Sequence, residues 1–260
     1  MLKRFWCLFF VLAFPASLAW GTAICFLVDV NAIYLAADGR MTQNVLGDGK
    51  SIAGTICKIR VIKTWIFLSS GVARVAASKF DIWDVAASSI GPQPTAEAGM
   101  EALKRSLSRS LPGTAAAFRK SNPSAFARIA IGLTPMVSVA LGSIEGGMAK
   151  LRVCEFFVNN NGGLDSPRCD TIQGTSSGSA GWTMGSNEAT LAYLKTHGAT
   201  MDHTEGGQLA FVRKSIGLEI LADRQSGENG VGPPIVVGKF DAAGLHIVEP
   251  GACIALGRRK

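Results

Sequence analysis

The order of its apolar runs constrains the fold of this 260-residue chain more than any other feature. Runs rich in β-branched and aromatic residues predict strands over residues 22–30, 33–37, 56–62, 65–69, 127–133, 137–144, 151–158, 235–240 and 245–248. Apolar residues at helical spacing predict helices over residues 76–90, 95–111, 188–195 and 208–223. The helices therefore come in two pairs between groups of strands. Grouping of this kind predicts an α+β fold rather than a doubly wound one.

Three local signals set the boundaries within this order. Thr95 is a helix-capping residue at the start of the second helix, and Pro112-Gly113 is expected to end it. The Gly/Ser-rich stretch 174–186 is expected to be a loop. No linker or internal repeat interrupts the chain after the first twenty-one residues. We therefore expect a single domain over residues 22–260.

The first twenty-one residues follow the pattern of a secretory signal peptide. Lys3 and Arg4 precede an apolar run over residues 5–18, and small residues stand at Ala19 and Gly21. The run is shorter than the roughly 20 residues that a membrane-spanning helix needs. An uncleaved membrane anchor is the alternative. We expect residues 1–21 to be removed, leaving an exported periplasmic or extracellular protein without stable membrane insertion.

Composition argues against two classes of partner. The chain has 26 basic and 19 acidic residues, but its basic residues are scattered and form no stripe interleaved with aromatics. We therefore expect no nucleic-acid partner. No pair of cysteines has CxxC spacing, and His197 and His203 lie in a polar stretch typical of a surface. We expect no metal and no cofactor.

Five cysteines follow the leader, which predicts at most two disulfides and one free thiol in an exported protein. Cys154 and Cys169 flank a turn-rich segment and are expected to close a hairpin. Strand alternation predicts that Cys25 and Cys57 both point away from the face that carries Thr22 and Lys58. A Cys25–Cys57 disulfide is therefore our hypothesis for the second pair.

Six short motifs follow one another between residues 22 and 227. Their candidate site residues are Thr22, Asp38, Lys58, Gly71, Ser186, Asp223 and Ser226. Thr22 opens an apolar run, and Asp38 follows it by sixteen residues within the sequence LAADGR. In order and approximate spacing these motifs resemble those of proteasome β-subunits of the 20S type. The resemblance spans nearly the whole chain after the leader, which ends where that family usually carries a propeptide.

The resemblance implies both a fold and an active site. The fold would be a four-layer αββα sandwich of two antiparallel sheets between helix layers, the N-terminal-nucleophile (Ntn) hydrolase fold. Thr22 would be the catalytic nucleophile, Asp38 would orient a charged Lys58, and the N–H of Gly71 would bind the oxyanion. The remaining three residues, Ser186, Asp223 and Ser226, would orient the amine and a water. The substrate would be a peptide or a small amide, and a homo-oligomer is possible.

Elementary chemistry supports a role for an N-terminal threonine. A hydroxyl is a weak nucleophile without a base, and an N-terminal Thr22 carries an amine on its own α-carbon. The pKa of an α-amine is about 7.7–8.0, well below the value of about 10.4 for a lysine side chain. A nearby ammonium such as that of Lys58 would lower the pKa of the α-amine further.

Two other functions are compatible with parts of the sequence. Residues 174–178 read GTSSG and satisfy G-x-S-x-G, with Asp223 and His246 following in the order of a serine hydrolase that would use Ser176. That motif requires a helix directly after the serine, and the glycines that follow disfavour one. A non-catalytic binding or structural module with the same fold and a blocked N-terminus is the other alternative.

Cleavage of the leader provides the first test. Signal-peptide rules allow cleavage before Trp20 or before Thr22. We expect the mature N-terminus to be Thr22, because only that register gives the threonine a free amine. N-terminal sequencing or intact mass of the exported protein measures this directly. A stable, active protein that begins at Trp20 would contradict the proposed use of Thr22.

Overall fold

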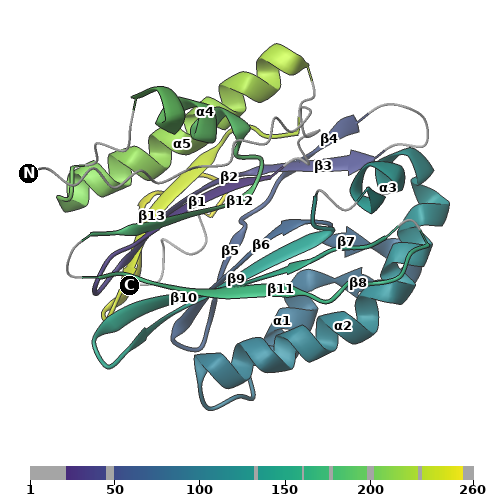
Figure 1. Cartoon of the computed structure of the whole chain (residues 1–260), viewed down its shortest axis with the longest axis horizontal. Helices are drawn as coiled ribbons and strands as arrows, with labels where there is room; N and C mark the ends of the chain where they lie inside the picture. The colour runs from purple at the N-terminus through teal and green to yellow at the C-terminus, as the bar shows by residue number, and fades with distance from the viewer. Residues whose placement is uncertain are drawn as a thin grey trace, which may run out of the picture.

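Two five-stranded antiparallel sheets lie face to face, and helices cover the outer side of each sheet (Figure 1). The structure is a computed structural model that describes residues 22–44, 50–131, 134–159, 161–175, 178–197, 202–227 and 230–253. Residues 1–21, for which we predict a signal peptide, lie outside the described residues. In the described part of the chain, no helix has the length and apolarity needed to cross a membrane. The predicted α+β class and its sandwich of two sheets are confirmed.

The first sheet carries the start of the described chain. Its strands, in spatial order, are β12 (Ala180–Gly185), β1 (Ala23–Val28), β2 (Ile33–Asp38), β13 (Ile235–Asp241) and β14 (Gly244–Glu249). Every residue of β1 is buried because both faces of the strand are covered. Ile24 packs in the core between the sheets, whereas Ala23 and Cys25 pack in the core that includes residues of helix α5 (Glu205–Ser226). Successive residues of β1 therefore face the two different cores, and Thr22 directly precedes the strand.

The second sheet packs against the other helix layer. Its strands, in spatial order, are β11 (Arg168–Gln173), β10 (Met148–Phe156), β9 (Val137–Glu145), β6 (Trp65–Gly71) and β5 (Ile59–Ile62). Its outer face is covered by α1 (Ile82–Ile90) and α2 (Ala96–Ser121), while α4 (Glu188–His197) packs on α5 beside the first sheet (Figure 1). The remaining elements are β3 (Arg40–Asn44), β4 (Lys50–Thr55), β7 (Arg74–Val75), β8 (Phe80–Asp81), a 3₁₀ turn (Ala76–Ser78) and α3 (Pro123–Ala130).

Two predictions around α2 and α3 are wrong. Helix α2 does not end at Pro112-Gly113 but continues to Ser121. Its later residues Ala115 and Phe118 stay buried in the same core as the earlier ones, so tertiary packing outweighs the helix-breaking proline. The strand predicted over residues 127–133 is instead α3, which begins with Pro123 in its first turn. Residues 132 and 133 lie outside the described part.

Three other segments also differ from prediction. The helix predicted over residues 76–90 begins at Ile82, after a short strand, because the Asp81 carboxylate accepts the N–H of Trp83 and caps it. The strand predicted over residues 56–62 begins only at Ile59. The Gly/Ser-rich stretch 174–186, predicted as a loop, contains β12, which pairs with β1 along its whole length. Glycines are acceptable there because the strand lies at the edge of the sheet.

One of the two predicted disulfides is present. Cys154 and Cys169 face one another across β10 and β11 and are bridged, as predicted. The Cys25–Cys57 hypothesis is wrong, because Cys57 is bonded to Cys253 and Cys25 is a buried free thiol. Alternation applies only within a strand, and Cys57 precedes β5 in a non-strand segment. Its side chain packs with the inter-sheet core, on the opposite side of the first sheet from Cys25.

Burial makes the Cys25 thiol a probe of the fold. Burial raises its pKa from 9.0 to about 12, against a hydrogen bond with Ser215 that lowers it. We therefore expect iodoacetamide to leave Cys25 unmodified in the native protein at pH 8 and to modify it in denaturant.

The same raised pKa predicts how stability depends on pH. The folded state keeps the Cys25 thiol proton that the unfolded state releases, so the free energy of unfolding falls between pH 9 and about 12. Mass spectrometry and pH-dependent urea unfolding measure the two effects. Rapid native alkylation would show that the β1–α5 contact is open.

Candidate functional site

The candidate site is built around a buried ion pair between Asp38 and Lys58. Asp38 is the last residue of β2, and Lys58 directly precedes β5 in the opposite sheet. The Lys58 Nζ donates to Asp38 Oδ1 at 2.6 Å, and the two side chains are 5% and 0% exposed. Separating the two sheets here would break the pair and leave a buried charge without its partner, which is strongly unfavourable. The pair therefore fixes the position of one sheet against the other at the site.

Asp38 accepts three further hydrogen bonds, all from backbone N–H groups. Its Oδ1 accepts from Ala23 N at 2.8 Å. Its Oδ2 accepts from Arg40 N and from Gly232 N, each at 3.2 Å. The carboxylate thus joins the start of β1, the turn after β2 and the segment before β13. Saturation by N–H donors is what allows a carboxylate to be buried completely.

Burial shifts the pKa of both members of the pair. Burial raises the pKa of Asp38, and the neighbouring Lys58 opposes that change. Burial lowers the pKa of Lys58, Asp38 opposes the change, and the positive charge of Arg40 adds to it.

Thr22 directly precedes β1 and is 7% exposed. Its carbonyl accepts the N–H of Ser186 at 2.8 Å. Gly185, next to Ser186, has a φ of +79°, and a Cβ there would lie only 1.9 Å from the Thr22 carbonyl oxygen. Glycine is required at 185 for this close approach. Thr22 is therefore fixed by β12 on one side and, through Ala23, by Asp38 on the other.

A buried carboxylate that the sequence motifs do not contain supports Ser186. Glu219 of α5 is 2% exposed, and its Oε2 accepts the Ser186 hydroxyl at 2.9 Å. Its Oε1 accepts the Thr190 N–H at 2.7 Å, in the first turn of α4. The sequence does contain a sign of this carboxylate. Ser215, Glu219 and Asp223 are spaced four residues apart in the predicted helix and so share one of its faces. All three are buried.

Asp223 lies near the end of α5 with a spare acceptor atom. Its Oδ1 accepts from Gly230 N at 3.0 Å. Its Oδ2 lies 3.9 Å from Arg40 Nη1, and within the described residues neither of these two buried atoms has a hydrogen-bond partner. Ser226 is exposed, and its hydroxyl donates to the Asp223 backbone carbonyl at 3.0 Å. Ser226 therefore contacts the backbone of the helix end rather than the Asp223 carboxylate.

Gly71 ends β6 and occupies a position that only glycine fits. Its φ is +89°, and a Cβ there would lie 2.3 Å from the Met136 carbonyl oxygen. It pairs with Val137 of β9, so it belongs to the same sheet as β5. The sequence-predicted residues thus come from both sheets and from α5, with direct contacts described for the pairs Asp38–Lys58, Thr22–Ser186 and Asp223–Ser226.

The geometry disfavours the serine-hydrolase arrangement. Ser176 lies outside the described residues. Gly178 leads into β12, whereas the motif requires a helix after its serine. His246 lies on β14, with its Nε2 3.3 Å from Asp241, while Asp223 contacts Gly230 and Arg40 instead.

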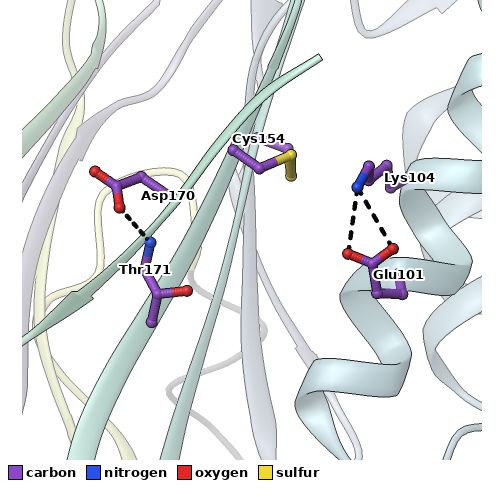
Figure 2. Close-up of a disulfide and its surroundings, with 6 residues drawn as sticks. Glu101, Lys104, Cys154, Asp170 and Thr171 are labelled. Carbon is purple, nitrogen blue, oxygen red and sulfur yellow. Dashed lines mark hydrogen bonds and ion pairs between the residues drawn. A yellow bond between two sulfur atoms is a disulfide. The ribbon is translucent and has the colours of Figure 1, made fainter. Parts of the chain in front are cut away.

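A separate groove of about 500 Å³ lies between α2 and the β10–β11 hairpin, beside the Cys154–Cys169 disulfide. Figure 2 shows that charged groups around it are paired locally. Lys104 contacts Glu101 on the same helix, and Asp170 accepts the N–H of Thr171. None of the motif residues lines this groove, so it does not enlarge the candidate site.

No family model and no curated protein matches this chain. Among solved structures, Anbu from Hyphomicrobium sp. strain MC1 is 15% identical, with 87% of this chain and 84% of that chain covered and a TM-score of 0.47. A mutant of that protein is 16% identical at the same coverage, with a TM-score of 0.48. Anbu from Yersinia bercovieri, an ancestral β-subunit, is 12% identical over 88% and 87%, with a TM-score of 0.49.

These findings correct the resemblance stated from the motifs. The expected relationship to 20S-type proteasome β-subunits is wrong, because the similar structures are Anbu proteins and no family model supports the 20S assignment. At 12–16% identity, none of them assigns a family or a catalytic function to this chain.

Glu219 allows a test of how the site is supported. Glu219→Ala leaves the Ser186 hydroxyl and the Thr190 N–H without their acceptor, so we expect a loss of about 1–3 kcal/mol in the free energy of unfolding. Glu219→Gln retains a carbonyl oxygen for Thr190 and should lose less. Urea denaturation measures both. Glu101→Ala on the exposed face of α2 is the matched control, with an expected change within about 0.5 kcal/mol. Equal stability of Glu219→Ala and wild type would contradict this support.

Proposed function

We propose that Thr22, made N-terminal by removal of residues 1–21, is the nucleophile of an amide hydrolase. The observation that carries the proposal is the buried Asp38–Lys58 pair, bonded to the backbone of the residue after Thr22. Asp38 Oδ1 accepts from both Ala23 N and Lys58 Nζ. The ammonium therefore lies beside the beginning of β1, where the α-amine of a mature Thr22 would be.

The reaction proceeds in two balanced steps. The Thr22 hydroxyl oxygen attacks the carbonyl carbon of the amide, and its proton passes to the α-amine. The C–N bond then breaks, the leaving amine takes that proton, and the acyl group remains on Thr22 as an ester. A water molecule attacks the ester carbonyl, gives one proton to the threonine oxygen through the α-amine, and releases a carboxylic acid.

Lys58 acts on the base rather than on the substrate. Its positive charge favours the neutral form of the α-amine, which is the form that can accept the hydroxyl proton. Asp38 fixes the ammonium in place through the bond of 2.6 Å. Because the pair is buried, its electric field is less weakened by water than that of a surface pair.

The other motif residues have supporting roles in the proposal. The N–H of Gly71 stabilises the oxyanion, a contribution of about 3–4 kcal/mol for one donor in comparable sites. Ser186 fixes the Thr22 carbonyl through its own N–H. Asp223 orients the amine and a water with its spare Oδ2, and Ser226 fixes the end of α5 that carries Asp223.

The proposal also covers the compartment, the substrate class and the oligomeric state of the protein. Two disulfides in the described residues are typical of a protein in an oxidising compartment, so we place the mature domain, residues 22–260, in the periplasm or outside the cell. The substrate is a peptide or a small acylated amine, and the active protein is a homo-oligomer without a cofactor.

Covalent labelling tests the nucleophile. We expect a hydroxyl-directed electrophile to modify Thr22 in the mature protein and to leave Thr22→Ala unmodified. Thr22→Ser should retain part of the reactivity, because it keeps both hydroxyl and amine. Lys58→Ala should lower the labelling rate by roughly a hundredfold or more, since it disables the base. Peptide mapping by mass spectrometry gives the modified residue, and circular dichroism checks that each variant folds.

Ser176→Ala is the control that separates the alternatives. It should label like wild type under the proposed mechanism. A label on Ser176 would establish the serine hydrolase instead. A protein that begins at Thr22 and labels at neither residue would be a non-catalytic module.

A further inference from the structure

The Cys57–Cys253 disulfide lies directly beside the candidate site. Cys57 is the residue before Lys58, and Cys253 belongs to the turn that follows β14. The two cysteines are separated by 196 residues. Cys253 is 1% exposed and packs with Cys57 in the core between the sheets. The bridge has no part in the proposed chemistry, so its position requires a separate explanation.

We propose that the Cys57–Cys253 disulfide positions Lys58 against Asp38, so that the site is complete only when this bridge is oxidised. The proposal depends on the proposed function for its consequence on activity, but its effect on the position of Lys58 can be measured independently. Cys57 and Cys253 are positioning residues here, since they act through Lys58 and touch no substrate.

The segment that carries Lys58 needs such support. Strand β4 ends at Thr55 and β5 begins at Ile59, so residues 56–58 belong to neither strand. Ile56 N donates to Gly39 O at 2.8 Å and fixes the beginning of the segment. The disulfide fixes its middle, one residue before Lys58. A lysine on an untethered segment would lose conformational freedom on binding Asp38, which opposes the contact.

The other end of the bridge is anchored beside Asp38. The turn that contains Gly251 packs so closely on β13 that a Cβ at Gly251 would lie 2.4 Å from Ile235 O. Ile235 is the β13 residue directly opposite Asp38. A Cβ at Gly39, the residue after Asp38, would lie 3.0 Å from the Cβ of Ala252. The disulfide therefore links the Lys58 segment to a turn that rests against the immediate neighbours of Asp38.

Water competes with Asp38 for the Lys58 ammonium. The side chain is buried, and burial lowers the pKa of Lys58 despite the attraction of Asp38. Removing the tether allows the segment to move outward, where the ammonium recovers its hydration. A cross-link that closes a long loop restricts the unfolded chain most, so this bridge also opposes global unfolding more than the short Cys154–Cys169 loop can.

The tether gives the site a dependence on redox conditions. A dithiol that reduces the bridge supplies two electrons and two protons. The sulfurs of Cys57 and Cys253 each become thiols, and the dithiol becomes a cyclic disulfide. In a reducing compartment Lys58 would then be released from Asp38. The enzyme would become active only after it reaches an oxidising compartment.

The test compares two double variants of the mature protein, Cys57→Ala/Cys253→Ala and Cys154→Ala/Cys169→Ala. The first readout is acetylation of Lys58 by acetic anhydride across a pH series, measured by mass spectrometry relative to the exposed Lys120. We expect Lys58 to be protected in wild type and in the Cys154/Cys169 variant. In the Cys57/Cys253 variant Lys58 should react at close to the rate of Lys120. The second readout is electrophile labelling of Thr22, which should fall by about tenfold or more in the Cys57/Cys253 variant only.

Each outcome is decisive. Protection of Lys58 that persists in the Cys57/Cys253 variant overturns the inference, as does labelling of Thr22 at the same rate in that variant and in a wild type that labels. If wild type does not label at Thr22 but Lys58 becomes reactive when the bridge is removed, the proposed function fails and the positioning role stands. Should the Cys57/Cys253 variant fail to fold, reduction of the Cys154→Ala/Cys169→Ala variant with dithiothreitol, followed by alkylation of the released thiols, makes the same comparison, because Cys57–Cys253 is then the bridge that is reduced.

Discussion

One buried carboxylate holds together the parts of the chain on which the site depends. Asp38 accepts four hydrogen bonds, and their donors come from the start of β1, the turn after β2, the segment before β5 and the approach to β13. Of these donors, only the Lys58 ammonium carries a full charge. A fully buried carboxylate keeps its charge only when hydrogen-bond donors saturate it. Each element that supplies a donor to Asp38 must therefore stay in its place. Thr22 gains its fixed position from this arrangement, through Ala23, without depending on a flexible loop.

Local sequence patterns predict the parts of the fold that periodicity alone determines. The apolar runs that became β1 and β2 and the helical spacing in α5 are strong enough to be found without tertiary information. The spacing between the threonine and the aspartate also places Asp38 at the end of β2, next to the start of β1. The Cys154–Cys169 bridge follows from a short hairpin between two extended segments. In each case the interacting residues are close in sequence or joined by one regular element.

The missed features depend on contacts that are distant in sequence. Pro112 ends no helix because the apolar face of α2 continues into the core on both sides of it. Strand β12 has the composition of a loop and becomes a strand because β1 needs a partner on that side. Cys57 pairs with a cysteine near the other end of the chain, and side-chain alternation says nothing of residues outside a strand. Glu219 supports Ser186 from a position one turn before Asp223 in α5, outside the motif that identifies Asp223 and Ser226.

The composition of the sheet edges affects where a strand of another chain could pair with this molecule. An open strand edge exposes unpaired N–H and C=O groups and can add a strand from another chain, unless charged side chains oppose it. Three of the four edge strands of the two five-stranded sheets carry charged residues, among them Arg60 on β5, Asp170 on β11 and Glu249 on β14. The fourth, β12, has the sequence AGWTMG and carries none. The edge strand without charged residues is therefore the one that is followed directly by Ser186, whose N–H binds the Thr22 carbonyl.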